Sequence, residues 1–88
     1  MNKEYIIKDI EKQFSLADEA FREYEELSNE GKGDVAMSRL RFISANLSYT
    51  LERFSVINDG WGLDGMSLML SRYMDNYLRY IKISNEGE

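Results

Sequence analysis

The stretch IIKDIEKQFSLADEAFREY, residues 6–24, decides the fold class of this chain. Its apolar residues recur at alternating intervals of three and four, which is the spacing of one face of an α-helix. The residues Ile6, Gln13, Ala20 and Leu27, which border this stripe and recur every seven positions, are also mostly apolar. They widen the stripe to the face of a bundle helix. The pattern predicts an amphipathic helix over about residues 3–30. The stripe consists of Ile7, Ile10, Phe14, Ala17, Phe21 and Tyr24, widened by Ile6, Gln13, Ala20 and Leu27.

The same spacing recurs in two later segments and predicts helices over about residues 35–58 and 66–83. The last of these is apolar over about half of its circumference, which is wider than the usual stripe of a surface helix. The final residues, 84–88, are expected to fray as a tail. The middle stripe is Ala36, Leu40, Ile43, Leu47, Thr50, Phe54 and Ile57, and the last is Met66, Met69, Leu70, Tyr73, Met74, Tyr77, Leu78, Tyr80 and Ile81.

Glycines separate the three segments, and the chain has no proline to interrupt a helix. Gly31 is expected just past the end of the first helix, and Asp34 and Asp64 are expected to cap the next two. Short connections make successive helices antiparallel neighbours. The prediction is an all-α, up-down-up three-helix bundle that forms one domain over residues 1–83. The alternative is a long helical hairpin that dimerises into a four-helix-type bundle.

The residue types that are missing exclude most chemistry. The 88 residues contain no cysteine and no histidine, so Ser–His and Cys–His catalytic pairs cannot form. We therefore expect no enzyme and assign no catalytic, cofactor-binding or metal-binding residue. No apolar run approaches the roughly 20 residues of a membrane span, and no signal-peptide pattern is present. These features predict a cytoplasmic protein without a membrane contact.

One stretch, GWGLDG at residues 60–65, matches the G-x-G-x-x-G spacing of phosphate-binding loops. Such a loop follows a buried strand and lies within a strand–helix–strand unit. Here a predicted helix precedes the motif, and the residues that follow can form only one more helix. The motif is therefore interpreted as a helix–helix connection, in which Trp61 either covers the end of the core or contacts a partner.

The acidic charge of the chain is concentrated in the first predicted helix. The net charge is −5, and residues 1–30 account for all of it, which argues against direct binding of nucleic acid. Four carboxylates share one helical face: Glu19, Glu23, Glu26 and Glu30. The simpler interpretation is a solvated face. The alternative is a nucleic-acid mimic that occupies a basic groove, and in composition alone the chain resembles small acidic helical proteins of phages and mobile elements.

The middle helix carries a second apolar row with a spacing of seven, formed by Val35, Phe42, Tyr49 and Val56. Either a neighbouring helix buries this row, or a partner protein covers it. Arg39 and Arg53 of the same helix are expected to face the acidic positions of the first helix. Those positions are Glu4, Glu11, Asp18 and Glu25. The tyrosines of the last helix, Tyr73, Tyr77 and Tyr80, follow its apolar stripe and are interpreted as core residues despite the arginines beside them.

These patterns together predict a small protein that binds another protein through helical faces, as a regulator or inhibitor, and that forms a homodimer. The predicted partner-binding patch is Phe42, Tyr49, Val56 and Trp61. Two alternatives remain, namely the nucleic-acid mimic acting through Glu19, Glu23, Glu26 and Glu30 and a structural subunit of a larger assembly.

Overall fold

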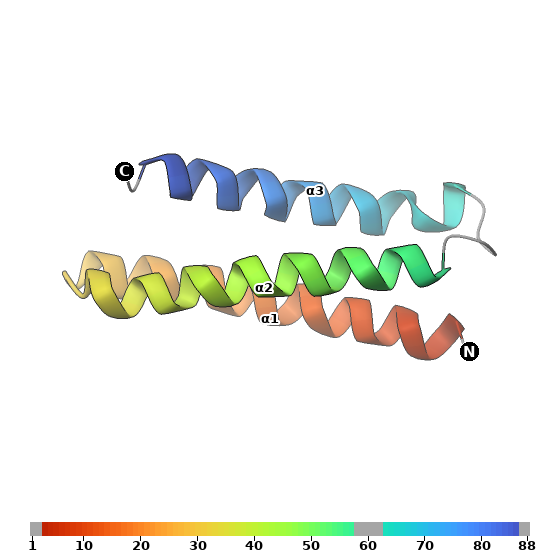
Figure 1. The fold of residues 1–88 in the computed structure, drawn as a ribbon, viewed down its shortest axis with the longest axis horizontal. Coiled ribbons are helices and arrows are strands. Elements are labelled where there is room, and N and C mark those ends of the chain that lie inside the picture. The colour runs from red at the N-terminus through yellow and green to blue at the C-terminus, as the bar shows by residue number, and fades with distance from the viewer. Residues whose placement is uncertain (1–2, 58–62, 87–88) are drawn as a thin grey trace.

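The computed structural model describes the backbone of residues 3–57 and 63–86, together with the side chains of residues 4–56 and 67–86. Three helices account for these residues: α1 (Lys3–Asn29), α2 (Gly33–Ile57) and α3 (Leu63–Glu86). They run up, down and up, so that α1 and α3 point in the same direction (Figure 1). The predicted all-α three-helix bundle is confirmed.

The turn between α1 and α2 ends the first helix with a well-defined hydrogen-bond pattern. Gly31 has a φ of 77°, in the left-handed region where a side chain is disfavoured. The amide of Lys32 donates to the carbonyl of Leu27 at 2.9 Å, and the amide of Gly31 donates to the carbonyl of Ser28 at 3.1 Å. These two bonds form a Schellman motif, which satisfies carbonyls that the end of a helix leaves open. The predicted role of Gly31 is confirmed.

The two predicted N-caps lie inside their helices. The amide of Ala36 donates to the carbonyl of Lys32 at 2.9 Å, so Lys32 occupies the cap position and Asp34 lies in the first turn. Helix α3 starts at Leu63, which places Asp64 within it. Aspartate is favourable in the first turn as well as at the cap, because both positions lie near the positive end of the helix dipole. Helix α3 also extends to Glu86, three residues beyond the predicted end.

The core lies mainly between α1 and α2, which pack most closely together. The predicted stripes of α1 and α2 supply most of it, except that Ile6 is buried whereas Ile7 is only partly buried. The predicted stripe of α3 was too wide: Tyr73 is buried, but four of its predicted members are exposed, namely Met74, Tyr77, Leu78 and Ile81. Two polar residues of α2, Asn46 and Thr50, are also buried. The hydroxyl of Thr50 donates to the backbone carbonyl of Asn46 at 2.8 Å. The buried apolar residues are Ile6, Ile10, Phe14, Ala17, Ala20, Phe21, Ala36, Leu40, Ile43, Leu47, Phe54 and Tyr73.

Helix α3 joins this core through a chain of aromatic rings. The ring of Phe54 on α2 lies 6.5 Å from that of Phe14 on α1 and 5.8 Å from that of Tyr73 on α3, measured between centroids. The second pair meets edge to face, at 81°, a geometry that the ring quadrupoles favour. Burial raises the pKa of the Tyr73 hydroxyl above its ordinary value, with a smaller contribution from Tyr77.

The acidic row of α1 faces α3, which corrects the prediction that Arg39 and Arg53 would pair with it. Arg72 binds Asp18 at 2.8 Å and Arg79 binds Glu25 at 2.7 Å. Each guanidinium also covers a buried ring of α1, with Arg72 4.8 Å from the centroid of Phe14 and Arg79 4.4 Å from that of Phe21. Arg39 and Arg53 instead reach Glu23 and Asp9, which lie on the opposite border of the α1 stripe.

The bundle is elongated, with extents of 46 × 21 × 16 Å. Its accessible surface is 6010 Å², whereas a compact monomer of the same mass, 10.3 kDa, exposes about 5,400 Å². The additional surface includes many large apolar side chains. Within the described part of the chain, no helix has the length and apolar character needed to cross a membrane.

Replacement of the two glycines of the α1–α2 turn should have opposite effects on stability. Gly31→Ala places a Cβ at a positive φ and should lower the free energy of unfolding by about 1–2 kcal/mol. Gly33→Ala is the matched control, because Gly33 is helical, has an ordinary φ and has no atom within 4 Å of an added Cβ. It should be neutral or stabilising by up to about 1 kcal/mol. Urea unfolding followed by circular dichroism measures both, and equal effects would contradict the assigned turn.

Candidate functional site

The second apolar row of α2 lies on the outside of the bundle. Val35, Phe42 and Val56 are exposed by 52%, 37% and 46%, and Tyr49 is partly buried. We call these four residues the α2 outer face. Tyr49 contacts α1, so the row lies on the α1 side of α2 and away from α3. The fourth member of the predicted patch, Trp61, lies outside the described residues.

A polar network ties Tyr49 to α1. The Tyr49 hydroxyl donates to Oδ2 of Asp9 at 2.5 Å, and Nε of Arg53 donates to the same oxygen at 2.8 Å. Nε of Arg53 also donates to the Tyr49 hydroxyl at 2.9 Å. The Tyr49 hydroxyl, assisted by Gln13 and Arg53, holds the pKa of the Asp9 carboxyl below its ordinary value despite partial desolvation. The Asp9 hydrogen bond in turn raises the pKa of Tyr49.

The network continues along the seam between α1 and α2. Nε2 of Gln13 donates to Oδ1 of Asp9 at 3.2 Å, and Nδ2 of Asn46 donates to both the backbone carbonyl and Oε1 of Gln13, at 2.9 and 3.1 Å. Sequence reasoning missed Asp9, Gln13 and Asn46 as a group. The available signal was that Gln13 interrupts the apolar row of Ile6, Ala20 and Leu27, so that it required a polar partner there.

Two arginines flank the aromatic residues of the α2 outer face. The guanidinium carbon of Arg39 lies 5.7 Å from the ring centroid of Phe42, and that of Arg53 lies 5.1 Å from the centroid of Tyr49. Each arginine is also held by a carboxylate of α1, Glu23 or Asp9. The face therefore combines exposed apolar surface with aromatic and arginine side chains whose positions are set by other contacts.

The acidic face of α1 is partly neutralised by the chain itself. Arg22 lies between Glu19 and Glu26, at 3.9 and 2.9 Å. Lys32 contacts Glu30 at 3.1 Å, and Arg39 contacts Glu23 at 3.9 Å. All four carboxylates thus have a basic group within 4.0 Å, and three of them are more than half exposed. Their charge is shared with the chain's own cations along the whole face.

The tyrosines of α3 do not form a platform. Tyr73 is buried, Tyr80 is partly buried, and Tyr77 is 41% exposed and stacks on Tyr73 with ring centroids 6.4 Å apart. The arginines beside them, Arg72 and Arg79, point to the acids of α1. The basic and aromatic groups therefore lie on different sides of the helix.

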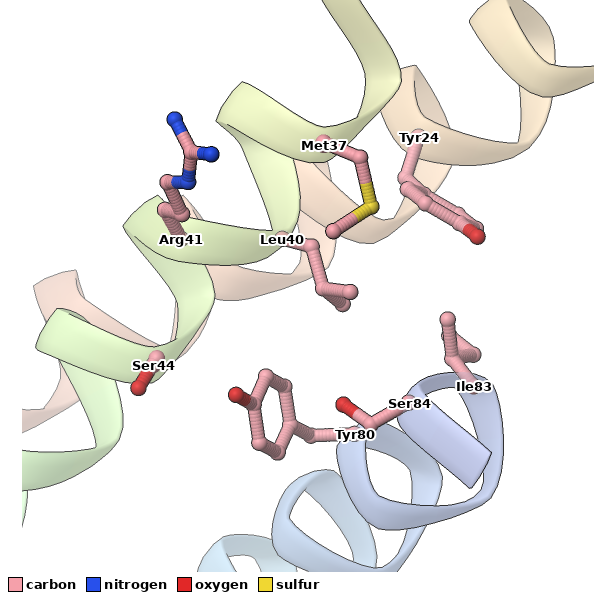
Figure 2. Close-up of a pocket in the computed structure, with 8 residues that line it drawn as sticks. All are labelled: Tyr24, Met37, Leu40, Arg41, Ser44, Tyr80, Ile83 and Ser84. Carbon is pink, nitrogen blue, oxygen red and sulfur yellow. The ribbon is translucent and has the colours of Figure 1, made fainter. Parts of the chain in front are cut away.

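A cleft of about 450 Å³ lies between the first half of α2 and the C-terminal end of α3 (Figure 2). Its lining combines apolar and hydroxyl-bearing side chains, with Met37 and Leu40 of α2 facing the side on which Tyr24 of α1 and Ile83 of α3 lie (Figure 2). The guanidinium of Arg41 extends along α2 away from Tyr80 in this view. The lining residues are Tyr24, Met37, Leu40, Arg41, Ser44, Tyr80, Ile83 and Ser84.

Comparison with known proteins provides no relative. The chain matches no family model, and neither a curated protein nor a solved structure matches it significantly. Across residues 3–57 and 63–86, no group of three or more carboxylates is placed to hold a metal ion. The functional argument therefore depends on the surfaces of the bundle.

The Asp9 network should give the protein a specific pH dependence. Because its folded-state pKa lies below the unfolded value, ionised Asp9 stabilises the fold above about pH 4, and this stabilisation is lost as the pH falls through the folded-state pKa. Asp9→Asn should therefore lower the stability near neutral pH, and its difference from the unmodified protein should shrink toward about pH 2. Urea unfolding between these pH values measures the difference.

Glu52→Gln is the control, since Glu52 is exposed and is in no ion pair within the described residues. It should change stability little near neutral pH. Tyr49→Phe should reproduce part of the effect of Asp9→Asn, because it removes the hydrogen bond that contributes most to lowering the Asp9 pKa. A neutral-pH loss for Glu52→Gln as large as that for Asp9→Asn would contradict the assigned network.

Proposed function

We propose that this chain is a non-enzymatic protein that binds another protein through the α2 outer face, as a regulator or inhibitor. The observation that carries the proposal is the exposure of Val35, Phe42 and Val56 in one row beside Tyr49. A helix in the middle of a bundle has two neighbours that can bury its apolar surface. A row left outside both is the kind of surface that marks an interaction site.

The composition of this face supports a protein partner. Interface residues that contribute most to binding are enriched in tyrosine and arginine, and they lie in patches where apolar and aromatic groups exclude water. The α2 outer face places Tyr49 and Phe42 beside Arg53 and Arg39, with apolar Val35 and Val56 at the two ends of the row.

Preorganisation adds to the argument. The Tyr49 hydroxyl and Nε of Arg53 share one carboxylate oxygen of Asp9, so both side chains are oriented before any partner arrives. Binding by ordered side chains loses less conformational entropy, and more of the interaction energy is then available as affinity. The partner surface that fits is an apolar strip that can pack against the exposed side chains of Val35, Phe42 and Val56.

The nucleic-acid mimic has less support. Such a mimic needs carboxylates free to meet the cations of a partner, whereas the four carboxylates of the α1 face already contact Arg22, Lys32 and Arg39. Exposed ion pairs of this kind are individually weak, at about 0–1 kcal/mol, yet each lowers the net charge that the face presents. The α2 outer face is therefore the surface that we assign to the partner.

A pair of substitutions on one helix tests the assignment. Phe42→Glu should abolish capture of the partner from a lysate of the native host, with loss of at least about 2 kcal/mol of binding free energy, since it places a charge in the middle of the face. Leu51→Glu is the matched control, because Leu51 is 54% exposed and lies outside the row. A protein captured by both the unmodified chain and Leu51→Glu, but not by Phe42→Glu, is the expected result.

Circular dichroism of both variants separates binding from folding. Retained helicity and cooperative unfolding of Phe42→Glu are expected because the side chain is already 37% exposed. Equal capture by Phe42→Glu and the unmodified chain would remove the α2 outer face as the binding site. Unfolding of Phe42→Glu would instead make Phe42 a core residue and would equally contradict the proposal.

A further inference from the structure

A second exposed apolar surface lies on α3, on the side opposite to its core residues Met69, Asn76 and Ile83. Met74, Leu78 and Ile81 are exposed by 47%, 58% and 36%. Their spacing of four and three places them on one face of the helix. We call these three residues the α3 outer face. It is separate from the α2 outer face, which lies on the α1 side of α2.

The α3 outer face ends at polar residues in both directions. Ser71 and Asn85 continue the three-and-four spacing, and both are exposed. The resulting series, Ser71, Met74, Leu78, Ile81 and Asn85, is nearly symmetric about Leu78. If two such helices pack in opposite directions, Leu78 meets Leu78, Met74 meets Ile81, and Ser71 meets Asn85. A surface that matches its own reverse is the requirement for a twofold dimer contact.

Charges beside the face favour the same arrangement. Asp75 and Lys82 are seven residues apart, on one border of the α3 outer face, and neither is in an ion pair within the described structure. Arg72 and Arg79, by contrast, are both paired with acids of α1. In an antiparallel pair centred on Leu78, residues whose numbers sum to about 156 are opposite each other. Asp75 then faces Lys82 of the second copy, and Lys82 faces the other Asp75.

We infer that two copies of this chain associate through antiparallel contact of their α3 outer faces. The contact brings together three large apolar side chains from each copy and two ion pairs at the border. This inference rests on the proposed function in one respect, since the dimer presents two copies of the α2 outer face to a protein partner. Only three large apolar side chains from each copy take part, so the contact is small and the dimer should dissociate on dilution.

Matched substitutions on α3 test the contact. Leu78→Glu places two carboxylates against each other at the twofold axis and should abolish the dimer. Leu68→Glu is the control, since Leu68 is 84% exposed and lies on the side of α3 next to Glu11 and Ser15 of α1. Each new glutamate precedes a basic residue by four positions, Lys82 or Arg72, so both variants add a carboxylate at the same helical spacing from a cation.

Sedimentation equilibrium of the purified protein over a concentration series measures the association. The unmodified chain and Leu68→Glu should show a concentration-dependent dimer, and Leu78→Glu should be monomeric with unchanged helicity. A monomer at every concentration of the unmodified chain would overturn the inference. A dimer that survives in Leu78→Glu would overturn it as well, because another surface would then hold the copies together.

A charge exchange tests the direction of packing. Asp75→Lys opposes two lysines at each border position and should raise the dissociation constant by about tenfold. The double variant Asp75→Lys with Lys82→Asp restores opposite charges only in the antiparallel arrangement and should return the dissociation constant to near its original value. Failure of the double variant to recover would overturn the antiparallel packing.

Cysteine cross-linking provides an independent measure, since the chain has no cysteine of its own. Under oxidation, Leu78→Cys should form a covalent dimer and Ser71→Cys should not, because Ser71 lies beside Asn85 of the second copy. Efficient cross-linking of Ser71→Cys would indicate parallel packing and overturn the inference. These measurements use the purified chain alone, so their failure leaves the partner capture that depends on Phe42 as a separate result.

Discussion

The ring of Phe54 is the constraint on which the rest of the bundle depends. It contacts Phe14 of α1 and, through an edge-to-face pair, Tyr73 of α3, so one side chain of the middle helix joins all three helices. Helices α1 and α2 pack closely along their length, whereas α3 contacts them less extensively. The position of α3 is set by this aromatic chain, by the two arginines that cover Phe14 and Phe21, and by the side chains of α3 that pack against the core, namely Met69, Leu70, Tyr80 and Ile83. Loosening at Phe54 would separate α3 while leaving much of the α1–α2 pair in place.

This unequal packing explains why apolar surface remains outside the core. Helix α2 uses its main stripe for α1 and α3. Its second row stays on the outside of the bundle, and only Tyr49 of that row is shown to be tied to α1, where its hydroxyl binds Asp9. Helix α3 is apolar over half of its circumference but meets the core along one stripe only, so Met74 and Leu78 remain exposed. Helices α2 and α3 thus each carry two apolar surfaces, one that packs in the core and one on the outside of the bundle. The two outer faces lie on different sides of the bundle, so they can be occupied at the same time.

Periodicity alone was sufficient to predict the three helices, the buried stripes of α1 and α2 and the role of Gly31, because burial and left-handed backbone impose simple local patterns. It overestimated the buried stripe of α3, in which Met74, Tyr77 and Leu78 are exposed. It was not sufficient to predict which neighbour borders which side of α1. The acidic row that includes Asp18 and Glu25 faces α3, and Arg53 reaches Asp9 instead, since the handedness of a three-helix bundle is not encoded in the spacing of any one helix. The outer row of α2 was recognisable from its spacing of seven, but the hydrogen bonds of Tyr49 were not. Such a bond depends on two residues that are 40 positions apart and carry no shared pattern.

The ion pairs between α1 and α3 are compatible with two alignments of α3 along α1, and the aromatic core selects one of them. The acids of α1 that border α3 recur every seven residues, at Glu4, Glu11, Asp18 and Glu25, and the two arginines of α3 are also seven apart. A slide of α3 by one heptad, about 10 Å toward the start of α1, would bring Arg72 to Glu11 and Arg79 to Asp18 and would keep two ion pairs. The ionic ladder alone therefore does not distinguish the two alignments. Only the observed alignment places Tyr73 against Phe54 and covers both Phe14 and Phe21. Ring packing, and not charge, therefore selects the position of α3 along the bundle axis.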